Sequence, residues 1–578
     1  MSVAYAGCRI SAYVGPTDSG RPRTKETVVL YETTLTRELA EQYRAAGWWP
    51  DRLLNDAVAN AVARHPEKTA LIDLRRRMTY AALQEQVDQC ALGLLVLGVR
   101  HGDVVTVQLP NWNEFVVLTL ALERIGAVIN PVAPNFRQRE LSVMLQLAGS
   151  VAVVIPASFR GWDYPAMYAE LLPDAPSLKH LIVVDGLCDN LDGRLSWTRL
   201  LASGAAHAAA RPALDWLRPS PDEVTSLGFT SGTTGQPKGV MHTANTLAAS
   251  LEAMIRGQQL TANDVFHMAS TVGHHSGFEW GVRLALHLGA QLVLQETWDP
   301  AVFVHMIEKE RITFSLGATP FLADTLRAPN LTEHDISSLR IFVCGGAPIP
   351  HPLAEEAGRR LPCRLVPVWG MTENSAVTAV LPSDPAEQIV NTDGQALPGM
   401  EVTVLDDNGA PLAQGQEGEL YTRGAFLFVG YVQGRRFTEQ YFTPDGWFAT
   451  GDRAVMDAMG FIRITGRSKD IIIRGGENIP VKEIEDLLLR HPQVRGVVLV
   501  GLPDPRLGEI ACACVIPESG EPLTLEQVRA FLRNERVTRS FWPERLECMD
   551  EFPMTPSGKV QKFRLRELLT ARQPVSAG

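Results

Sequence analysis

The sequence predicts an α/β protein with a large N-terminal domain of parallel-rich sheets plus a β module, and a small α+β C-terminal domain. Three observations predict this class. Helical and strand patterns alternate from Trp49 onward, short runs separated by glycine- and aspartate-rich turns replace them after about Gly394, and a mixed pattern follows Gly466. At 578 residues the chain is also too long for one compact core.

The first region has a β-α-β rhythm, which predicts parallel sheets covered by helices. Helical spacing predicts helices over Leu53–Arg64, Ala81–Leu97, Asn113–Ile125 and Ala244–Arg256. Apolar runs predict strands at Val104–Leu109, Ala127–Val132, Val151–Ile155, Leu181–Val184, Val224–Phe229, Ala290–Gln295, Leu339–Cys344 and Leu365–Val368. The alanine-rich stretch Ala202–Ala210 is interpreted as a surface loop.

The second region predicts an antiparallel module, and the third a small separate domain. Strands are expected at Glu401–Leu405, Gly418–Tyr421 and Phe461–Ile464, then at Val494–Leu502 and Ala511–Ile516, with helices at Val481–Arg490 and Leu525–Asn534. These patterns place the large domain at residues 46–466 and the small domain at 467–578. Residues 1–45, rich in Gly, Pro, Ser and Thr up to about Leu39, are interpreted as a loosely attached extension.

Composition excludes several classes of partner. The net charge of −11 is spread without a long basic or acidic block, which argues against nucleic acid or an anionic membrane as the main partner. No apolar stretch reaches about 18 residues without a charge, so no membrane span is predicted. The N-terminus has no secretory pattern and the eight cysteines are scattered, which predicts a cytoplasmic protein. Cys512 and Cys514 share one face of a predicted strand and are expected to be buried hydrophobes rather than metal ligands.

The most informative motif is the loop Thr230–Gly239, which reads Thr-Ser-Gly-Thr-Thr-Gly-Gln-Pro-Lys-Gly. Its glycines allow sharp turns and close approach to an anion, its hydroxyls are donors, and Lys238 carries a positive charge. Lying between a predicted strand and a predicted helix, it is expected to hold a polyphosphate. It is not a kinase or NTPase loop, because Lys238 precedes glycine instead of Ser or Thr, and it lacks the Gly-x-Ser-x-Gly of a hydrolase elbow.

Five further motifs follow this loop, each weak by itself. They are Val343–Ile349 with paired glycines, Trp369–Glu373, Trp447–Asp452, Gly466–Asp470 and Pro553–Lys559. Taken singly, tight turns, a helix cap or a solvated lysine explain them. Together with the loop, in this order and spacing over about residues 50–570, they resemble the adenylate-forming superfamily of acyl-CoA synthetases, peptide-synthetase adenylation domains and luciferases.

This resemblance implies an ATP site and, at Glu373, a Mg²⁺ ligand. It places the adenine between Gly345–Ala347 and Trp369, which departs from the family's usual tyrosine but can still stack. Asp452 would bind the ribose with help from Arg467. The implied ATP-binding residues are Thr230, Ser231, Gly232, Thr233, Thr234, Gly235, Lys238, Gly345, Gly346, Ala347, Trp369, Gly370, Met371, Thr372, Asp452 and Arg467.

The resemblance also implies a two-step reaction. A carboxylic acid and ATP give an acyl-adenylate and pyrophosphate; the small mobile domain then turns at a hinge over 467–470, with Lys469 at the pivot, and a thiol releases AMP. The implied catalytic residues are Thr230, His274, Glu373 and Lys559, the last on a loop over 553–560. A lysine placed there at the transition state would stabilise charge on the α-phosphate. In the second arrangement Gly475, Gly476 and Asn478 would line a pantetheine tunnel.

Thr271–Gly281 matches the family segment that lines the acyl pocket, and His274 takes the place of its gating aromatic residue. The expected lining residues are His274, His275, Ser276, Gly277, Phe278, Trp280 and Val368. No third ligand follows the paired histidines closely in sequence, so zinc is disfavoured, and the absence of a suitably placed aspartate disfavours an amino acid substrate. The small residues Gly273, Ser276 and Gly277 predict room for a bulky or cyclic acid. Together with the lead-in Tyr43–Trp49, the segment resembles acyl-CoA synthetases for aryl, alicyclic and medium-chain acids, which implies a bulky, cyclic or medium-chain carboxylic acid.

The sequence leaves two candidates for the acceptor thiol, coenzyme A and an acyl carrier protein. No obvious insertion between Glu373 and Asp452 would block rotation, which favours an ATP-dependent carboxylic acid:CoA ligase. Against this, Ser540–Arg545 lacks the lysine that many CoA ligases carry before the Pro-x-Arg stretch. A carrier-loading acyl-AMP ligase and a non-catalytic nucleotide-binding module are the alternatives. A homodimer is implied only at the level of the family.

Overall fold

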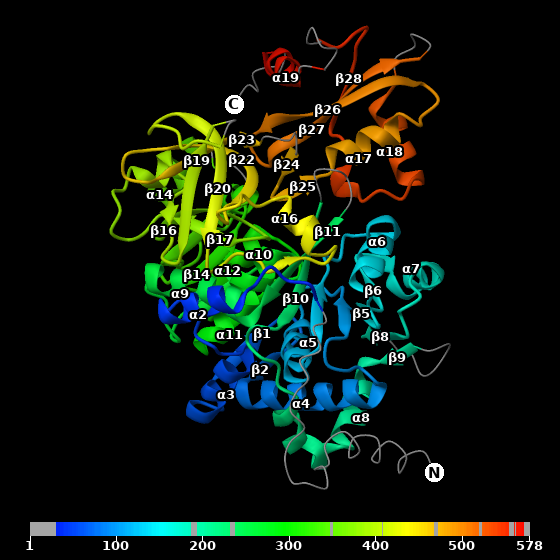
Figure 1. Cartoon of the computed structure of the whole chain (residues 1–578), viewed down its shortest axis with the longest axis vertical. Helices are drawn as coiled ribbons and strands as arrows, with labels where there is room; N and C mark the ends of the chain where they lie inside the picture. Colours follow the sequence, from blue (N-terminus) through cyan, green and yellow to red (C-terminus); the bar gives the residue numbers. More distant parts are fainter. Residues whose placement is uncertain are drawn as a thin grey trace.

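Two mostly parallel β-sheets form the centre of the large domain (Figure 1). The structure is a computed structural model that describes residues 31–185, 194–231, 237–346, 349, 351–406, 409–467, 472–518, 523–553, 560 and 562–571. The first sheet has the order β21 (Gly430–Tyr431), β11 (Pro237–Thr243), β10 (Val224–Ser231), β4 (Val128–Pro131), β3 (Val104–Val107), β5 (Ala152–Pro156), β8 (His180–Val184) and β9 (Arg194–Ser196). From β10 to β9 its neighbours run parallel.

The second sheet has nine strands with a parallel centre from β16 to β1. Its order is β18 (Gln395–Ala396), β17 (Ser375–Ala379), β16 (Arg364–Met371), β15 (Ile341–Gly345), β14 (Phe314–Gly317), β12 (Val265–Met268), β13 (Gln291–Leu294), β1 (Thr69–Ile72) and β2 (Arg77–Thr79). A short ribbon, β6 (Ser158–Phe159) and β7 (Trp162–Asp163), stands apart.

Helices cover these sheets as the apolar spacing predicts. Their bounds are α3 (Leu54–Arg64), α4 (Tyr80–Leu97), α5 (Asn113–Arg124), α6 (Gln138–Ala148), α7 (Tyr164–Leu171), α8 (Trp197–Ala205), α9 (Ala244–Gln258), α11 (Leu284–Leu288), α12 (Pro300–Glu310), α13 (Thr319–Leu326), α14 (His351–Arg360), α15 (Gln388–Asn391) and α16 (Arg435–Glu439). Every residue of α5 from Asn113 to Glu123 is buried, because this helix is enclosed on all sides. No described helix is both long and apolar enough to cross a membrane.

A four-stranded antiparallel sheet forms the expected β module, and a five-stranded sheet lies in the small C-terminal domain. The module consists of β19 (Met400–Leu405), β20 (Glu417–Gly424), β22 (Phe448–Met456) and β23 (Ile462–Arg467). The small domain contains β24 (Ile472–Arg474), β25 (Glu477–Ile479), α17 (Val481–Leu488), β26 (Val494–Asp504), β27 (Gly508–Pro517), α18 (Leu525–Asn534), β28 (Arg545–Cys548) and α19 (Lys562–Ala571). This architecture confirms the predicted α/β class.

The two faces of the small sheet carry different helices. Leu499 and Ala513 pack on the side of α17 and α18, whereas Cys512 and Cys514 lie buried with Leu565 of α19 on the other side. The two cysteines are free thiols in the core, as their alternate spacing predicts.

Two local predictions are wrong. Ala202–Ala210 is not a loop: it contributes to α8 and to the short helical segment Ala208–Leu217, because alanine is the strongest helix former. The loop after β10 does not lead directly into a helix. It leads into strand β11, which pairs antiparallel with β10 from Val224↔Thr243 to Ser231↔Pro237, and only then does α9 begin.

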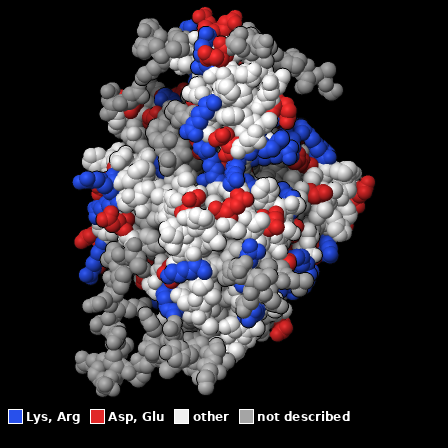
Figure 2. Space-filling view, turned by 90° about the vertical axis from the view of Figure 1, so that its right-hand side faces the viewer, with Lys and Arg blue, Asp and Glu red and all other residues white. Residues whose placement is uncertain are grey.

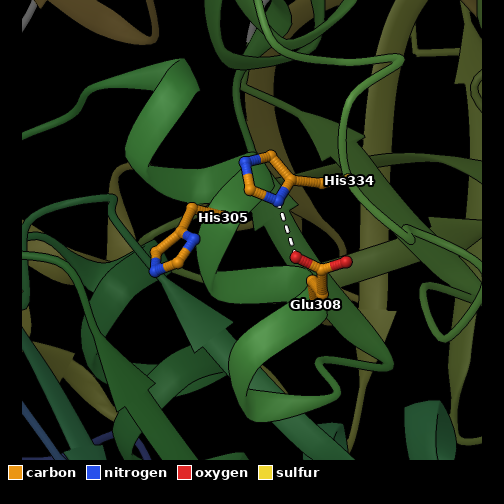
Figure 3. A group of neighbouring side chains, drawn as sticks. All are labelled: His305, Glu308 and His334. Carbon is orange, nitrogen blue, oxygen red and sulfur yellow. Dashed lines mark hydrogen bonds and ion pairs between the residues drawn. The ribbon is translucent and has the colours of Figure 1, made fainter.

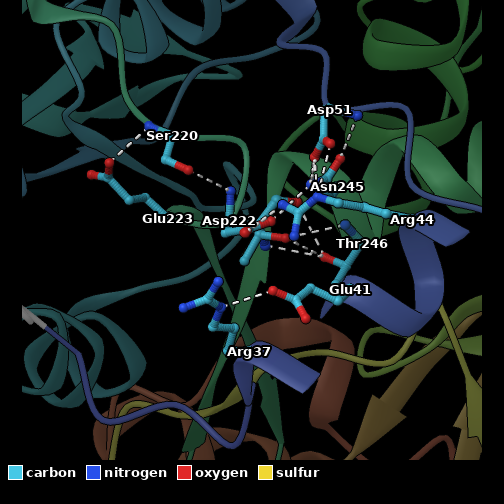
Figure 4. Close-up of polar contacts among 10 residues, drawn as sticks. Arg37, Glu41, Arg44, Asp51, Ser220, Asp222, Glu223, Asn245 and Thr246 are labelled. Atoms are coloured by element: carbon cyan, nitrogen blue, oxygen red, sulfur yellow. Dashed lines mark hydrogen bonds and ion pairs between the residues drawn. The ribbon is translucent and has the colours of Figure 1, made fainter. Parts of the chain in front are cut away.

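Residues 31–51 pack against the large domain (Figure 4). The backbone N–H of Thr34 donates to the carbonyl of Val429 (2.8 Å), and helix α2 (Arg37–Ala45) follows. Arg44 of α2 pairs with Asp222, and Asn245 donates to both Asp51 and Asp222 (2.8 Å each). The part of the predicted N-terminal extension that the structure describes therefore contacts the start of β10 and α9.

Candidate functional site

A cavity of about 340 Å³ lies between the two large sheets and the small domain. Five parallel strands from both sheets, β4, β10, β12, β14 and β15, end at or next to its wall. This is where α/β sheets usually bind ligands, because loops at the carboxyl ends of the strands surround a crevice. Among the described residues that line it, none is lysine or arginine.

Predicted ATP-binding residues gather at one side of this cavity. Thr230, Gly345, Gly346, Gly370, Met371 and Thr372 all line it. Two of these positions require glycine, because backbone passes very close: a Cβ on Gly370 would lie 1.7 Å from the carbonyl oxygen of Ser375, and one on Gly345 would lie 2.7 Å from that of Val368. Neither position therefore has room for a side chain.

Trp369 and Asp452 do not line the cavity, and a hydrogen bond joins their side chains. The Trp369 indole donates to a carboxylate oxygen of Asp452 (2.9 Å), and both residues are buried. Asp452 also lies opposite Arg467 in the β22–β23 pair. The adenine and ribose roles of these residues stay predictions, and the structure adds that the indole and the carboxylate fix each other's position.

Lys238 and Glu373 are joined to an aromatic cluster that the motif analysis missed. The Lys238 ammonium lies 3.8 Å from the ring centroid of Tyr441 and 5.0 Å from that of Tyr431. The Tyr431 hydroxyl donates to Glu373 (2.9 Å). Burial and the Glu373 carboxylate raise the pKa of Tyr431 well above its ordinary value. Glu373 is a buried oxygen donor beside the cavity-lining Thr372, which suits the ligand chemistry of Mg²⁺.

The predicted acyl pocket forms the other side of the cavity. His274, His275, Ser276, Phe278, Trp280 and Val368 line it, as predicted. Gly277 is not part of the wall, but a Cβ there would lie 2.2 Å from the carbonyl of Thr271, so packing also requires a glycine. The segment runs from a short helix, His275–Gly277, into a π-helix, Phe278–Arg283, a form often found at functional sites.

Two polar residues of this pocket come from distant strands and were not predicted. His242 of β11 stacks on His275 with ring centroids 5.4 Å apart, and His275 Nε2 lies 3.0 Å from the hydroxyl of Ser375. His242 Nε2 must donate to the carbonyl of Thr372 (2.7 Å), since a carbonyl only accepts. Burial lowers the pKa of His242 to about 4 and holds that of His275 well below its ordinary value. These two histidines therefore make a polar but uncharged part of the pocket wall at neutral pH.

Ser375 has a backbone φ of +56°, which a non-glycine residue adopts only at a cost. This conformation lies beside a register shift between β16 and β17 at Trp369/Gly370. The strain brings the serine hydroxyl to His275 and its carbonyl to Gly370. A strained residue here is consistent with a site whose geometry is set by ligand requirements.

The small domain closes one end of the cavity. Gly475, Gly476 and Asn478, at and after the turn between β24 and β25, line it together with Glu477 and Phe541. Polar contacts hold this arrangement: Asn135 donates to Glu477 (2.8 Å), and ion pairs join Arg139 to Glu483, Arg506 to Asp324 and Arg536 to Glu170. Figure 2 shows Lys and Arg side chains gathered where the two domains meet.

Several predicted residues fall outside the described residues: Gly232, Thr233, Thr234 and Gly235 of the phosphate loop, Ala347, the hinge residue Lys469 and Lys559. For Ser231 and Arg467 only the backbone is described. Helix α19, which begins three residues after Lys559, lies at the opposite end of the small domain from the cavity-lining turn (Figure 1).

One cluster of His and Glu side chains lies outside this cavity (Figure 3). His305 and Glu308 come from α12, and His334 from the loop after α13; in the described chain they are the only three such residues close enough to share a metal ion. Both Glu308 oxygens already accept hydrogen bonds, from the His334 ring (2.6 Å) and from the backbone of Asp335 (3.0 Å). The cluster therefore serves to fasten that loop to α12.

Comparisons with known proteins agree on one family. A model of the AMP-binding enzyme family matches residues 58–432, and one of the AMP-binding enzyme C-terminal domain matches residues 483–559. A medium-chain fatty-acid–CoA ligase of Escherichia coli is 36% identical over 550 residues, covering 95% of this chain and 96% of that protein. A salicyl-AMP ligase/salicyl-S-ArCP synthetase of Mycobacterium tuberculosis is 33% identical, with 93% and 94% covered. The solved amide bond synthetase McbA of Marinactinospora thermotolerans superposes with a TM-score of 0.77 at 28% identity, over 89% of this chain and 99% of that one.

Proposed function

Because the chain belongs to the AMP-binding enzyme family, we propose that it joins a carboxylic acid to coenzyme A at the expense of ATP. A carboxylate oxygen attacks the α-phosphorus and pyrophosphate leaves, giving an acyl-adenylate. A thiol sulfur then attacks the acyl carbon, loses its proton and displaces AMP. The observation that carries this proposal is a single cavity that joins the glycine turns, the acyl pocket and the Gly475–Asn478 segment of the small domain.

In this proposal the phosphate loop and Thr372 hold the phosphates, and Lys238 neutralises part of their charge. Asp452, fixed by Trp369, would receive the ribose hydroxyls. Mg²⁺, when bound at Glu373, would neutralise the phosphate oxygens. The backbone at Gly345 and Gly346 would lie against the adenine, since a Cβ at Gly345 has no room there.

The pocket supports a monocarboxylic acid with a bulky, cyclic or medium-chain uncharged tail. Its walls include Phe278, Trp280, Leu316, Phe321 and Val368, which suit apolar groups. A second carboxylate would find no lysine or arginine among the described lining residues and only neutral histidines. The named relatives, a medium-chain fatty-acid–CoA ligase and a salicyl-AMP ligase, act on acids of this kind.

The test is AMP release, with and without coenzyme A, over a panel of octanoate, decanoate, benzoate, salicylate and naphthoate. We expect CoA-dependent release with at least one of these acids, at a kcat/KM at least about tenfold above that for acetate or succinate, a difference of about 1.4 kcal/mol. Acetate as the best substrate would contradict the pocket assignment. Absence of pyrophosphate exchange with every acid, despite ATP binding, would favour the non-catalytic alternative.

The same AMP-release assay distinguishes coenzyme A from a carrier protein as the acceptor of the acyl group. Adenylate formation without CoA-dependent release, followed by transfer to a phosphopantetheinylated carrier protein, would favour the carrier-loading alternative, which the salicyl-AMP ligase/salicyl-S-ArCP synthetase relative supports. The small domain already presents Gly475, Gly476 and Asn478 to the cavity, which supports thiol delivery from that side. Homodimer formation and a cytoplasmic location stay predictions.

Gly476→Ala is expected to slow thioester formation about tenfold while leaving adenylation close to wild type. Gly476 has φ +88°, and a Cβ there would lie 3.1 Å from that of Ala318, in the space where the thiol arm would pass. Gly460→Ala is the matched control, because Gly460 has nearly the same φ (+85°) but open space around it. Single-turnover transfer from preformed acyl-adenylate measures the effect. Equal slowing by both substitutions would show that backbone strain, not access, is responsible.

A further inference from the structure

We propose that Tyr431 is a positioning residue that fixes Lys238 and Glu373 relative to each other, and that Tyr441 holds the Lys238 ammonium ready for phosphate. The proposal rests on the proposed function, because it concerns residues expected to act on MgATP. It adds two residues that belong to none of the motifs that predicted the site. Neither tyrosine lines the cavity.

Strand pairing places Tyr431 beside Lys238. In the register of β11 and β21, Val240 lies opposite Tyr431, and Lys238 is two residues before Val240 on the same face of the strand. A diagonal neighbour on one face of an antiparallel pair lies within reach of long side chains. The Lys238 ammonium is accordingly 5.0 Å from the Tyr431 ring centroid, and Tyr441 contacts it from another side at 3.8 Å.

The Thr372–Glu373 turn is contacted by β11 and by its neighbour β21. His242, two residues after Val240, donates to the Thr372 carbonyl (2.7 Å), and Tyr431 donates its hydroxyl to Glu373 (2.9 Å). The side-chain amide of Gln433, two residues after β21, also donates a hydrogen bond to the backbone carbonyl of Pro237 in β11 (2.9 Å). Movement of the strand that carries Lys238 is thus coupled to the position of the Glu373 carboxylate.

The chemistry of the two tyrosines suits this role. An aromatic face attracts an ammonium without neutralising it, so Lys238 keeps its full charge for an incoming phosphate. A hydroxyl donated to a carboxylate fixes its orientation while leaving it anionic. Tyr431 is itself immobile: it is buried, with ring centroids of Phe428, Phe437 and Tyr441 at 4.6, 5.5 and 5.4 Å.

Three variants separate the two contacts. Tyr431→Phe removes only the hydroxyl, Tyr441→Leu removes only the ring that faces Lys238, and Tyr441→Phe is the control that keeps this ring. Each is measured by calorimetric binding of ATP at a series of Mg²⁺ concentrations without any acid, by thermal unfolding, and by pyrophosphate exchange. The binding experiment does not depend on turnover.

Tyr431→Phe is expected to raise the Mg²⁺ concentration needed for half-maximal ATP binding about threefold to tenfold. Tyr441→Leu is expected to raise the ATP Kd by a similar factor, about threefold to tenfold, at saturating Mg²⁺ without changing the Mg²⁺ midpoint, and Tyr441→Phe to change neither. In a Glu373→Gln background, Tyr431→Phe should have no further effect on the Mg²⁺ midpoint, because its partner carboxylate is gone.

An unchanged Mg²⁺ midpoint in Tyr431→Phe, or the same shift in Tyr441→Phe, would overturn the proposal. So would a Tyr431→Phe effect that persists in the Glu373→Gln background. These outcomes leave the proposed function intact, provided that the wild-type protein binds MgATP. Failure of the wild type to bind MgATP would instead refute the proposed function itself.

Discussion

Lys559→Ala is expected to slow acyl-adenylate formation roughly a hundredfold or more, but to leave thioester formation from preformed acyl-adenylate within a few-fold of wild type. This is the result expected if a cation is delivered to the α-phosphate only during the first step, since loss of one preorganised group that stabilises developing charge costs that much. Helix α19, which begins three residues after Lys559, lies on the face of the small sheet away from α17 and α18, at the end opposite the cavity-lining turn (Figure 1). We therefore expect the small domain to turn between the two steps.

The matched control is Lys562→Ala. This nearby lysine forms an ion pair with Glu485 (2.9 Å) inside the small domain, so its loss should lower stability without distinguishing the two half-reactions. Pyrophosphate exchange measures the first step, and single-turnover acyl transfer measures the second. Equal losses in both steps for Lys559→Ala would refute delivery of this lysine in only one arrangement.

Glu279 should make the unfolding free energy of the wild-type protein decrease as the pH rises from 5 to 8. Its carboxyl is fully buried in the π-helix beside the acyl pocket, and burial raises its pKa to about 8, although nearby Arg283 opposes this. Between the ordinary pKa of a glutamate and 8, the folded protein holds a proton that the unfolded chain has lost. The stabilisation is therefore complete below the unfolded pKa and is lost as the pH rises through the folded one.

The Glu279→Gln variant isolates this effect. Gln cannot titrate, so the difference in unfolding free energy between variant and wild type should change by on the order of 3 kcal/mol between pH 5 and pH 8 in favour of the variant. A constant offset from the altered Arg283 environment, 3.5 Å away, cancels in this difference. Urea unfolding at each pH measures it, with Glu401→Gln at the exposed Arg423 ion pair as control. A pH-independent difference would show that Glu279 is ionised throughout.

Many of the residues that the structure gathers around the cavity could be predicted from the sequence because its motifs are local. Gly345, Gly370 and Thr372 each lie at the end of a strand that could be recognised from its apolar run, and six of the seven expected acyl-pocket residues line the cavity. A turn that requires glycine can be recognised from a few consecutive residues, because only glycine fits its backbone geometry.

The residues that were missed depend on contacts between distant segments. His242 and Ser375 reach the pocket from β11 and β17, and Tyr431 reaches Lys238 only through strand pairing. Strand β11 itself was missed because the predicted phosphate loop was expected to lead directly into the following helix. The aromatic run around Phe437 and Tyr441 was a visible signal, but aromatic residues close together usually indicate core packing and do not by themselves indicate a phosphate site.

Ion pairs and hydrogen bonds, such as Arg139 with Glu483 and Asn135 with Glu477, join the two domains beside an aromatic contact of Phe136 with Phe541. The charged and polar groups would regain water if the domains separated, which would offset part of the loss of these contacts. We expect these contacts to favour a junction that opens and closes during the proposed reaction cycle. Because salt screens such pairs, ionic strength should tune how long the enzyme dwells in each arrangement, and with it which half-reaction limits the cycle.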